Sequence, residues 1–402
     1  MKYYSLDRIL EKNALYNIVF GERSNGKSFS VWEYGIERYC KTGKKLAVIR
    51  RWQDDFKGKR APEMTSALVS TGKIKKYSKN EYTKTHYQGG RWYLAKDDSD
   101  TGKVITDPEP FAYAFALTAM EHDKSTSYPD VDTILFDEFL TRDGYLPDEF
   151  VLFMNTLSTI IRERSNIKIF MLGNTVNKWC PYFEEMGLKH IKDMKQGDID
   201  LYTYGDSSLT VAVEYAKPNE KGKKSDKYFA FNNPKLQMIT GGDWEMDIYP
   251  HLPEKYVPKD VIFRYFIEFG GEKLQCEIVE NNKGNFTYIH RKTTDFKHTD
   301  KDIIFSPNTK THHVNLRRNI ANVYDEVGRR IYLYFKMDKI FYQSNEIGEI
   351  VRNYLMWCGK WGLYVGVRSI IHHSSRVTVD CSIYNRKEVV RPLFSCPINW
   401  TI

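Results

Sequence analysis

Short apolar runs alternate with helix-like segments through the first half of the chain. Four runs are rich in β-branched or aromatic residues, which is typical of buried strands; they lie at residues 15–20, 46–49, 133–136 and 167–172. Apolar residues recur at helical spacing over residues 29–39 and 148–164, the second helix being about four turns long. A polar and aromatic stretch at 73–96, with a turn at 88–91, indicates an inserted hairpin. Strands that alternate with helices predict an α/β domain with a mainly parallel sheet.

A different pattern follows a polar stretch at residues 216–227, which lacks periodicity and is typical of a linker or loop. Beyond it, three strand-like runs lie at residues 261–269, 274–280 and 286–291. Short turns containing glycine or asparagine join these runs, which predicts an antiparallel meander. Mixed strand and helix signals then continue to the end, so the second half is expected to be α+β.

The length of 402 residues exceeds what one hydrophobic core usually organises. We expect an N-terminal domain at 1–195, a hinge region at 196–228 and a C-terminal domain at 229–402. Hydrophobic residues make up 41% and charged residues 28% of the chain, which excludes a collagen-like, low-complexity or wholly disordered protein. No apolar run approaches the roughly 18–20 residues of a membrane span, and the N-terminus lacks an apolar signal region. We therefore expect no membrane contact and a cytoplasmic location.

Net charge and cysteine spacing say less about the function than the pattern of strands and helices does. The 60 basic and 52 acidic residues leave a net charge of +8, which is compatible with a polyanionic partner without identifying one. None of the six cysteines forms a C-x-x-C pair, so the sequence favours neither a zinc ribbon nor a redox dithiol.

The first chemical motif is the run Gly21-Glu-Arg-Ser-Asn-Gly26-Lys27-Ser28, which satisfies G-x-x-x-x-G-K-[ST]. Its glycines allow backbone N–H groups to surround phosphate oxygens, Lys27 supplies a cation to the β- and γ-phosphates, and the Ser28 hydroxyl can bind Mg²⁺. The alternative is an ordinary surface turn that contains glycine. A strand before the motif and a helix after it favour the phosphate loop, and with it ATP and Mg²⁺ as cofactors.

The second motif is a hydrophobic strand that ends in two adjacent carboxylates, Asp137 and Glu138. Asp137 would hold the hydrated Mg²⁺, and Glu138 would orient and polarise the attacking water. Two acids after a strand are also common as a solvated turn. With a phosphate loop upstream, the acidic pair favours a motor-type NTPase, because a small-molecule kinase has its own acceptor and needs no water-activating glutamate.

Three further residues are candidates for the same site. Asn174 ends a strand and would lie near the γ-phosphate, although an Asn there also serves as a turn or helix-cap residue. Arg162 and Arg164 lie near the end of the predicted helix and could stabilise a transferring phosphoryl group. Their alternative is a solvated role at the helix C-terminus.

The sequence resembles the DNA encapsidation ATPases of small tailed phages. The likeness spans roughly residues 14–185, in the family's order. It rests on residues 16–28, 48–51, 124–139, 145–149, Arg162, 172–174 and 181–183.

This resemblance implies an additional-strand, catalytic-glutamate P-loop ATPase. It would act as a motor that moves double-stranded DNA into a procapsid, as a ring of identical subunits, pentameric in the family. A portal and a packaging RNA would be its further partners, and it would dock on the procapsid in the host cytoplasm and be absent from the mature virion.

The resemblance also implies residue roles. Arg162 falls where the family places an arginine finger that acts on the neighbouring subunit, and Lys124 matches a basic position linked to the same site. Arg23 resembles the loop arginine of packaging motors, and its alternative is a solvated loop charge. Ser24 and Asn25 complete the residues expected to bind nucleotide.

Large terminases pair such an ATPase with an RNase H-like nuclease, and the meander from 261 to 291 looks like the opening of that fold. Its first strand carries Arg264 and a late Glu268 where a central aspartate would be expected. Glu277 and Glu280 follow on the next strand, at positions that can face opposite sides. We therefore expect a degenerate domain that binds nucleic acid without cutting it. Candidate contacts are Arg317, Arg318, Arg329, Arg330, Lys336, Lys339, His372 and His373.

Three alternatives stay open. A full terminase would need a cluster of carboxylates in the C-terminal domain. A P-loop nucleotide kinase would transfer phosphate to an acceptor without DNA stimulation. A nucleotide-gated binding module would bind ATP without turnover.

Overall fold

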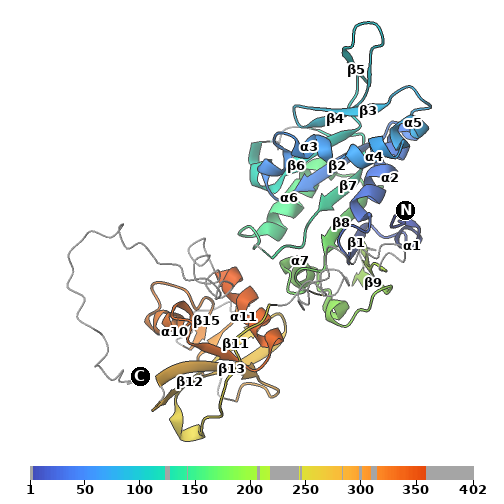
Figure 1. Ribbon diagram of the computed structural model, residues 1–402. Helices are drawn as coiled ribbons and strands as arrows, with labels where there is room; N and C mark the ends of the chain where they lie inside the picture. The colour runs from blue at the N-terminus through green and yellow to red at the C-terminus, as the bar shows by residue number, and fades with distance from the viewer. Residues whose placement is uncertain are drawn as a thin grey trace, which may run out of the picture. The chain divides into compact units, whose positions relative to one another are not determined.

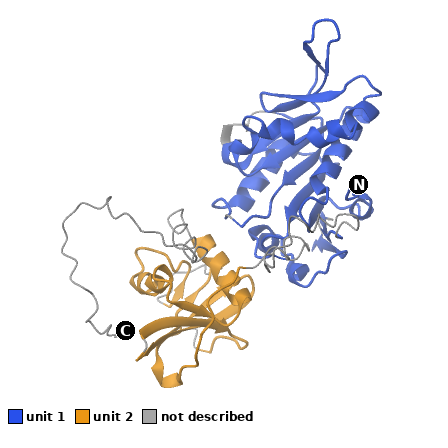
Figure 2. Cartoon of the chain, in the orientation of Figure 1, with its two compact units in different colours: residues 1–246 blue, residues 247–402 orange. Residues whose placement is uncertain are grey.

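The computed structural model describes residues 3–122, 127–142, 144–205, 209–217, 244, 247–282, 284–297, 301–308 and 315–358. The chain divides into two compact units, residues 1–246 and 247–402 (Figure 2). Each unit is built around its own sheet. The expected domain boundaries at 195 and 228 stay predictions.

The first unit contains a mixed sheet with a parallel centre (Figure 1). Its described strands run in the order β3-β4-β6-β2-β7-β8-β1-β10-β9, with β5 paired to β4. The parallel strands are β1 (Tyr16–Gly21), β2 (Lys45–Arg50), β6 (Ala112–Ala116), β7 (Val131–Asp137), β8 (Lys168–Asn174) and β10 (Leu209–Tyr215). The predicted apolar runs are thus confirmed as strands of a mainly parallel sheet.

Strand β8 lies between β1 and β7, so one additional strand separates the phosphate-loop strand from the strand of the acidic pair. In this register Gly21 lies opposite Asn174, and Asp137 lies opposite Leu172. Because the carboxyl ends of parallel strands meet at one edge, the two candidate motifs and Asn174 share that edge. The α/β fold of additional-strand type is confirmed.

Side-chain alternation explains why these strands are buried on both faces. Ile18 and Phe20 of β1 pack with Phe136 of β7 on one face of the sheet. Val19 and Leu135, their neighbours in sequence, pack on the other face. Helices cover both faces, so the central strands are continuously apolar, as parallel strands generally are.

The helices of the first unit follow the same logic. They are α1 (Asp7–Leu10), α2 (Lys27–Thr42), α3 (Arg60–Glu63), α4 (Ser66–Ser70), α5 (Lys73–Tyr77), α6 (Glu149–Ile161) and α7 (Pro181–Glu185). Short 3₁₀ turns occur at Gln53–Phe56, Leu117–His122 and Lys189–Lys192. Helix α2 begins after Gly26 and ends before Gly43, both left-handed, with φ of 92° and 72°. The predicted helix at 148–164 ends earlier, at Ile161, because Arg162 leaves the helical conformation with φ of 52°.

The predicted hairpin is present as β3 (Lys84–Gln88) and β4 (Arg91–Asp97), with its turn at Gly89-Gly90. The start of the predicted stretch, however, forms α5. Strand β5 (Val104–Thr106) adds to β4.

Part of the predicted hinge region belongs to the first sheet. Strand β9 (Ile199–Tyr204) pairs antiparallel with β10, which pairs parallel with β1. The alternating half-buried pattern of β9 gives its sequence a weak strand signal. Of the predicted linker at 216–227, residues 218–227 lie outside the described residues.

Helix α6 supplies a test of how the core is held. Phe153 is fully buried and stacks on Phe136 with ring centroids 4.9 Å apart. Phe153→Ala is expected to lower the free energy of unfolding by about 3–5 kcal/mol, since it leaves a cavity between helix and sheet. A urea titration followed by circular dichroism measures this change. Val151→Ala, on the exposed face of the same helix, should change it by about 0.5 kcal/mol or less; equal losses would contradict this packing.

The second unit has a sheet with described strand order β15-β14-β11-β12-β13-β16. These strands are β11 (Val261–Phe269), β12 (Glu272–Asn281), β13 (Gly284–Arg291), β14 (Ile304–Phe305), β15 (Leu316–Arg317) and β16 (Ile340–Tyr342). The expected antiparallel meander is confirmed as β11, β12 and β13. Strand β14 pairs parallel with β11, and β15 pairs parallel with β14.

Two helices, α10 (Glu326–Lys336) and α11 (Asn345–Cys358), and a 3₁₀ turn at Pro258–Asp260 complete the described part of the second unit. His372 and His373 lie outside the described residues. No helix in the described parts of the chain is both long and apolar enough to cross a membrane.

Candidate functional site

The phosphate-loop motif joins the end of β1 to the start of α2. Gly26 has φ of 92°, and a Cβ atom there would lie 2.7 Å from the Tyr3 ring, so both conformation and space require glycine. Lys27 and Ser28 open α2. The N–H groups of the first turn and the dipole of this 16-residue helix thus point toward the loop, which suits an anion.

The Lys27 ammonium is buried and connects the loop to the end of β8. Its Nζ donates to the Glu22 carbonyl at 2.7 Å and lies 3.2 Å from Asn25 Oδ1 and 3.4 Å from Asn174 Oδ1. Burial lowers the pKa of Lys27 to about 8, while the nearby Asp137 and Glu22 favour its charged form. The structure therefore brings Lys27, Asn25 and Asn174 together.

Ser28 and Asp137 meet directly, since the Ser28 hydroxyl donates to Asp137 Oδ1 at 2.8 Å. A hydroxyl oxygen and a carboxylate oxygen are ligands that Mg²⁺ accepts. The two residues come from the first turn of α2 and the last position of β7. The donor set fits a divalent cation held beside the phosphate loop.

Glu138 follows Asp137 and leaves the strand in a left-handed conformation, with φ of 60°. Its side chain is 63% exposed, so its carboxylate can be reached from solvent. Arg50, the last residue of β2, lies between the two acids: its Nη1 is 3.1 Å from Glu138 Oε2 and 3.4 Å from Asp137 Oδ2. This guanidinium offsets the repulsion between the adjacent carboxylates.

Arg50 received no role in the sequence analysis. It follows a predicted strand whose carboxyl end lies at the same sheet edge as the motifs. Its position at the end of a predicted strand could have marked Arg50 as a site residue. That inference, however, requires knowing that β2 lies next to β7.

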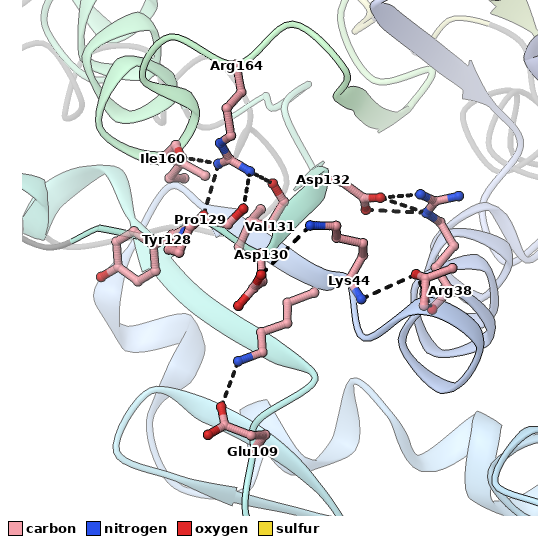
Figure 3. Close-up of polar contacts among 12 residues, drawn as sticks. Arg38, Lys44, Glu109, Tyr128, Pro129, Asp130, Val131, Asp132, Ile160 and Arg164 are labelled. Carbon is pink, nitrogen blue, oxygen red and sulfur yellow. Dashed lines mark hydrogen bonds and ion pairs between the residues drawn. The ribbon is translucent and has the colours of Figure 1, made fainter.

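Arg162 lies at the opposite end of the sheet from the phosphate loop. Helix α6 begins after the carboxyl end of β7 and runs back toward its start. Arg164, two residues beyond Arg162, donates to the carbonyls of Tyr128, Pro129 and Ile160, and so ties the end of α6 to the start of β7 (Figure 3). Six residues of strand, about 20 Å, separate that point from Asp137.

Arg162 itself is exposed. The structure thus does not bring it together with the phosphate loop of its own chain. Arg164 instead holds backbone carbonyls, as a helix-end arginine can. Of the other predicted residues, Arg23 and Ser24 are exposed on the loop and Lys124 lies outside the described residues.

The second unit neutralises one of its candidate nuclease carboxylates. Glu277 lies opposite Arg264 in the sheet, and Arg264 Nη2 is 2.9 Å from Glu277 Oε1. Gln275 and Tyr256 also donate to this carboxylate. Although burial, the largest influence, raises the pKa of Glu277, these hydrogen bonds hold it below its ordinary value. No three His, Cys, Asp or Glu side chains gather as a metal site within the described residues.

Several candidate DNA contacts of this unit have partners within the chain. Arg317 pairs with Asp325, Arg330 pairs with Glu326, and Lys339 donates to Asn285 at 2.7 Å. Arg318 is exposed and lies over the Trp357 ring. Arg329 and Lys336 are also exposed.

Residues 1–196 match the family model of the podovirus DNA encapsidation protein (Gp16). The predicted resemblance to phage DNA encapsidation proteins is therefore confirmed for the N-terminal part of the chain. The match contains the phosphate loop, the acidic pair and Asn174.

Individual DNA packaging proteins show the same extent of similarity. The chain is 31% identical to the DNA packaging protein of Bacillus phage B103 over 190 residues, which cover 46% of this chain and 50% of that protein. It is 27% identical to the DNA packaging protein of Bacillus phage phi29 over 185 residues, 45% and 49% of the two chains. The chain thus spans about half the length of the curated relatives it matches.

The fold extends the similarity further than the sequence does. A chain of the Phi-28 gp11 DNA packaging motor matches with a TM-score of 0.53 at 17% identity, over 89% of this chain and 98% of that one. At this identity the likeness concerns the fold alone.

Proposed function

We propose that this protein is an ATP-driven motor that moves double-stranded viral DNA into a procapsid. The observation that carries this function is the meeting of Lys27, Ser28, Asp137, Glu138 and Asn174 at one edge of an additional-strand sheet. The match of this same region to a DNA encapsidation family supports the choice of DNA as the substrate that is moved.

Each residue then has a chemical task. The loop N–H groups and Lys27 bind the phosphates of ATP, and Ser28 with Asp137 would hold Mg²⁺, which supplies charge neutralisation at the phosphates when bound. Glu138 orients a water molecule and accepts its proton. Asn174, beside Lys27, responds to the presence or loss of the γ-phosphate.

Arg162 is assigned to the site of a neighbouring subunit. Its distance from its own phosphate loop supports a role in trans, because a rigid helix cannot bring it back. This assignment requires a ring of identical subunits, which we propose to be pentameric, with Lys124 and Arg23 near the same inter-subunit contact.

The second unit is assigned to DNA binding without cleavage. Its antiparallel meander flanked by the parallel β14 and β15 supports an RNase H-like fold. The pairing of Arg264 with Glu277 supports the loss of nuclease activity, since that carboxylate is already neutralised. The portal of the procapsid and a packaging RNA are the further partners we propose, with docking in the host cytoplasm.

The destination of the γ-phosphoryl group tests the reaction class. In water labelled with ¹⁸O, the released phosphate should carry the label, because Glu138 activates water. A P-loop kinase would instead place the phosphoryl group on an acceptor and release no labelled phosphate. If the protein binds ATP but neither hydrolyses it nor transfers its phosphoryl group to an acceptor, the result would favour the nucleotide-gated binding module.

The pKa of Lys27 predicts how ATP affinity depends on pH. With this pKa lowered to about 8, the protonated form that pairs with phosphate predominates below pH 8 and is lost as pH rises through 8. Affinity should therefore fall by about 10-fold between pH 7 and pH 9. Titration with a fluorescent, non-hydrolysable ATP analogue measures it. Lys27→Arg, which stays charged, should bind with a flat pH profile; a flat profile for the wild type would contradict the lowered pKa.

A further inference from the structure

A buried ion pair lies beside the sheet edge that carries the acidic pair Asp137 and Glu138. Arg51, the residue after β2, approaches Glu149, the first residue of α6, with Nε 2.7 Å from Oε2 and Nη2 2.8 Å from Oε1. The two side chains are 6% and 1% exposed. Planar, bidentate geometry of this kind is the strongest that arginine makes with a carboxylate.

The same guanidinium also holds the backbone that follows β7. Arg51 Nη2 donates to the Phe139 carbonyl at 2.8 Å, and Nη1 donates to the Glu138 carbonyl at 3.3 Å. The Tyr145 ring covers the guanidinium, whose central carbon lies 5.1 Å from the ring centroid. Arg51 thus bridges Glu149 and two consecutive peptide groups.

Those peptide groups have an unusual conformation. Glu138 has φ of 60°, a left-handed value that a residue with a side chain keeps only where its surroundings hold it. Because φ at Glu138 sets the direction of its side chain, whatever fixes this backbone also aims the carboxylate.

Glu149 is fixed in turn by groups from two other segments. The backbone N–H of Leu146 donates to Oε2 at 2.7 Å, and the Tyr182 hydroxyl donates to Oε1 at 2.8 Å. The carboxylate that orients Arg51 therefore has little freedom to move. The chain of contacts runs from α7 and α6 through Arg51 to the backbone of Glu138.

We propose that Arg51 and Glu149 are positioning residues for hydrolysis, which hold Glu138 in the conformation that aims its carboxylate at the attacking water. This role rests on the proposed function of Glu138. The contacts described above lead to the backbone of Glu138 and not to the residues that bind phosphate. Changes at Arg51 or Glu149 should therefore lower the rate of hydrolysis and leave the affinity for nucleotide unchanged.

The informative variant is Arg51→Lys. Lysine keeps a positive charge beside Glu149 but is a point charge, and it lacks the planar fork that reaches both carbonyls. We expect kcat for ATP hydrolysis to fall by about 10²-fold, the effect of a misplacement of about 1 Å at a reacting group. The Kd for a non-hydrolysable ATP analogue should stay at its wild-type value.

The chain offers a matched control at the other end of β7. Arg38 Nε lies 3.0 Å from Asp132 Oδ2 (Figure 3), and Asp132 stands at the start of β7 whereas Asp137 ends it. Arg38→Lys makes the same chemical change in another arginine–carboxylate pair, which joins α2 to β7. The Arg38 side chain is 35% exposed and that of Arg51 is 6% exposed, so the unfolding transition of both variants is measured alongside kcat. Arg38→Lys should leave kcat unchanged, and a fall in kcat that follows the loss of stability in both variants would reduce Arg51 to a stabilising role and overturn the proposal.

A double variant separates positioning from general damage. If Arg51 acts through Glu138, adding Arg51→Lys to Glu138→Gln should cause no further fall in kcat, because effects of residues acting as one unit are not additive. A further fall of about 10²-fold in the double variant would show an independent effect and overturn the proposal.

Amide hydrogen exchange measures how firmly the backbone after β7 is held, and it does not require ATP turnover. Peptides covering residues 138–142 should exchange faster in Arg51→Lys than in wild type, and Arg38→Lys should not change them. Unchanged exchange would overturn the proposal whether or not the protein hydrolyses ATP. Absence of wild-type turnover would instead count against the proposed function alone.

Discussion

Glu138→Gln is expected to leave only a small residual rate of ATP hydrolysis while ATP binding is kept. The amide has the shape of the carboxylate but accepts no proton, so the loss should reach about 10²–10⁴-fold. Binding should persist because the contacts of the phosphate loop come from Lys27 and the start of α2, which the change leaves intact. Single-turnover hydrolysis and equilibrium binding of ATP measure the two effects separately.

A control for this variant lies elsewhere in the same unit. Glu81 is exposed in the turn between α5 and β3, so Glu81→Gln removes one carboxylate without changing the residues assigned to catalysis. It should hydrolyse ATP at the wild-type rate. Hydrolysis by Glu138→Gln above about a tenth of the wild-type rate would contradict the role given to Glu138.

Arg162→Ala should reduce turnover in subunits that do not carry the change. An arginine finger contributes about 10³–10⁵-fold to phosphoryl transfer. Arg162 ends the helix that is tied to the start of β7, and Asp137 lies at the other end of this strand, about 20 Å away, so we assign Arg162 to a neighbour. When variant and wild-type chains are mixed under DNA-stimulated conditions, turnover should fall out of proportion to the variant fraction. Steady-state phosphate release across a series of mixing ratios measures this.

Arg60→Ala serves as the control for mixing, because Arg60 is another exposed arginine of the first unit. Its mixtures should keep the wild-type rate at every ratio. A loss that is linear in the Arg162→Ala fraction would contradict the proposed coupling between the subunits of a ring, since each site would then act independently.

Local patterns were sufficient for the motifs of the first unit. Lys27 and Ser28 close the loop that follows one strong apolar run, and Asp137 and Asn174 stand at or just beyond the end of two others, so position in sequence already predicted position at the sheet edge. The structure brings these four together, as the parallel topology requires.

Roles that depend on strand neighbours could not be predicted in the same way. Arg50 ends β2 and Arg51 follows it, and the acidic groups that they meet at the site lie 87–98 residues further along the chain. No local spacing relates them, and only the pairing of β2 with β7 places them beside Asp137 and Glu138. Arg164 is similar, since its carbonyl partners at Tyr128 and Pro129 belong to a different element.

Sequence patterns also did not predict the strands β10 and β9 at one edge of the first sheet. Leu201 in β9 is 53% exposed, and this half-buried strand resembles the polar stretch that follows it. Strand β10 is more deeply buried, but its place beside β1 rests on a parallel pairing across more than 190 residues.

The most direct test of the central claim is steady-state ATP turnover with and without double-stranded DNA, for wild type and Glu138→Gln, with the DNA then examined on a gel. A DNA-driven motor predicts that DNA stimulates the wild type, that turnover of the variant is about 10²–10⁴-fold lower, and that the DNA stays uncut, also with Mn²⁺ present. Turnover indifferent to DNA would contradict the motor and favour a kinase. Fragmented DNA would contradict the assignment of the second unit and indicate a full terminase.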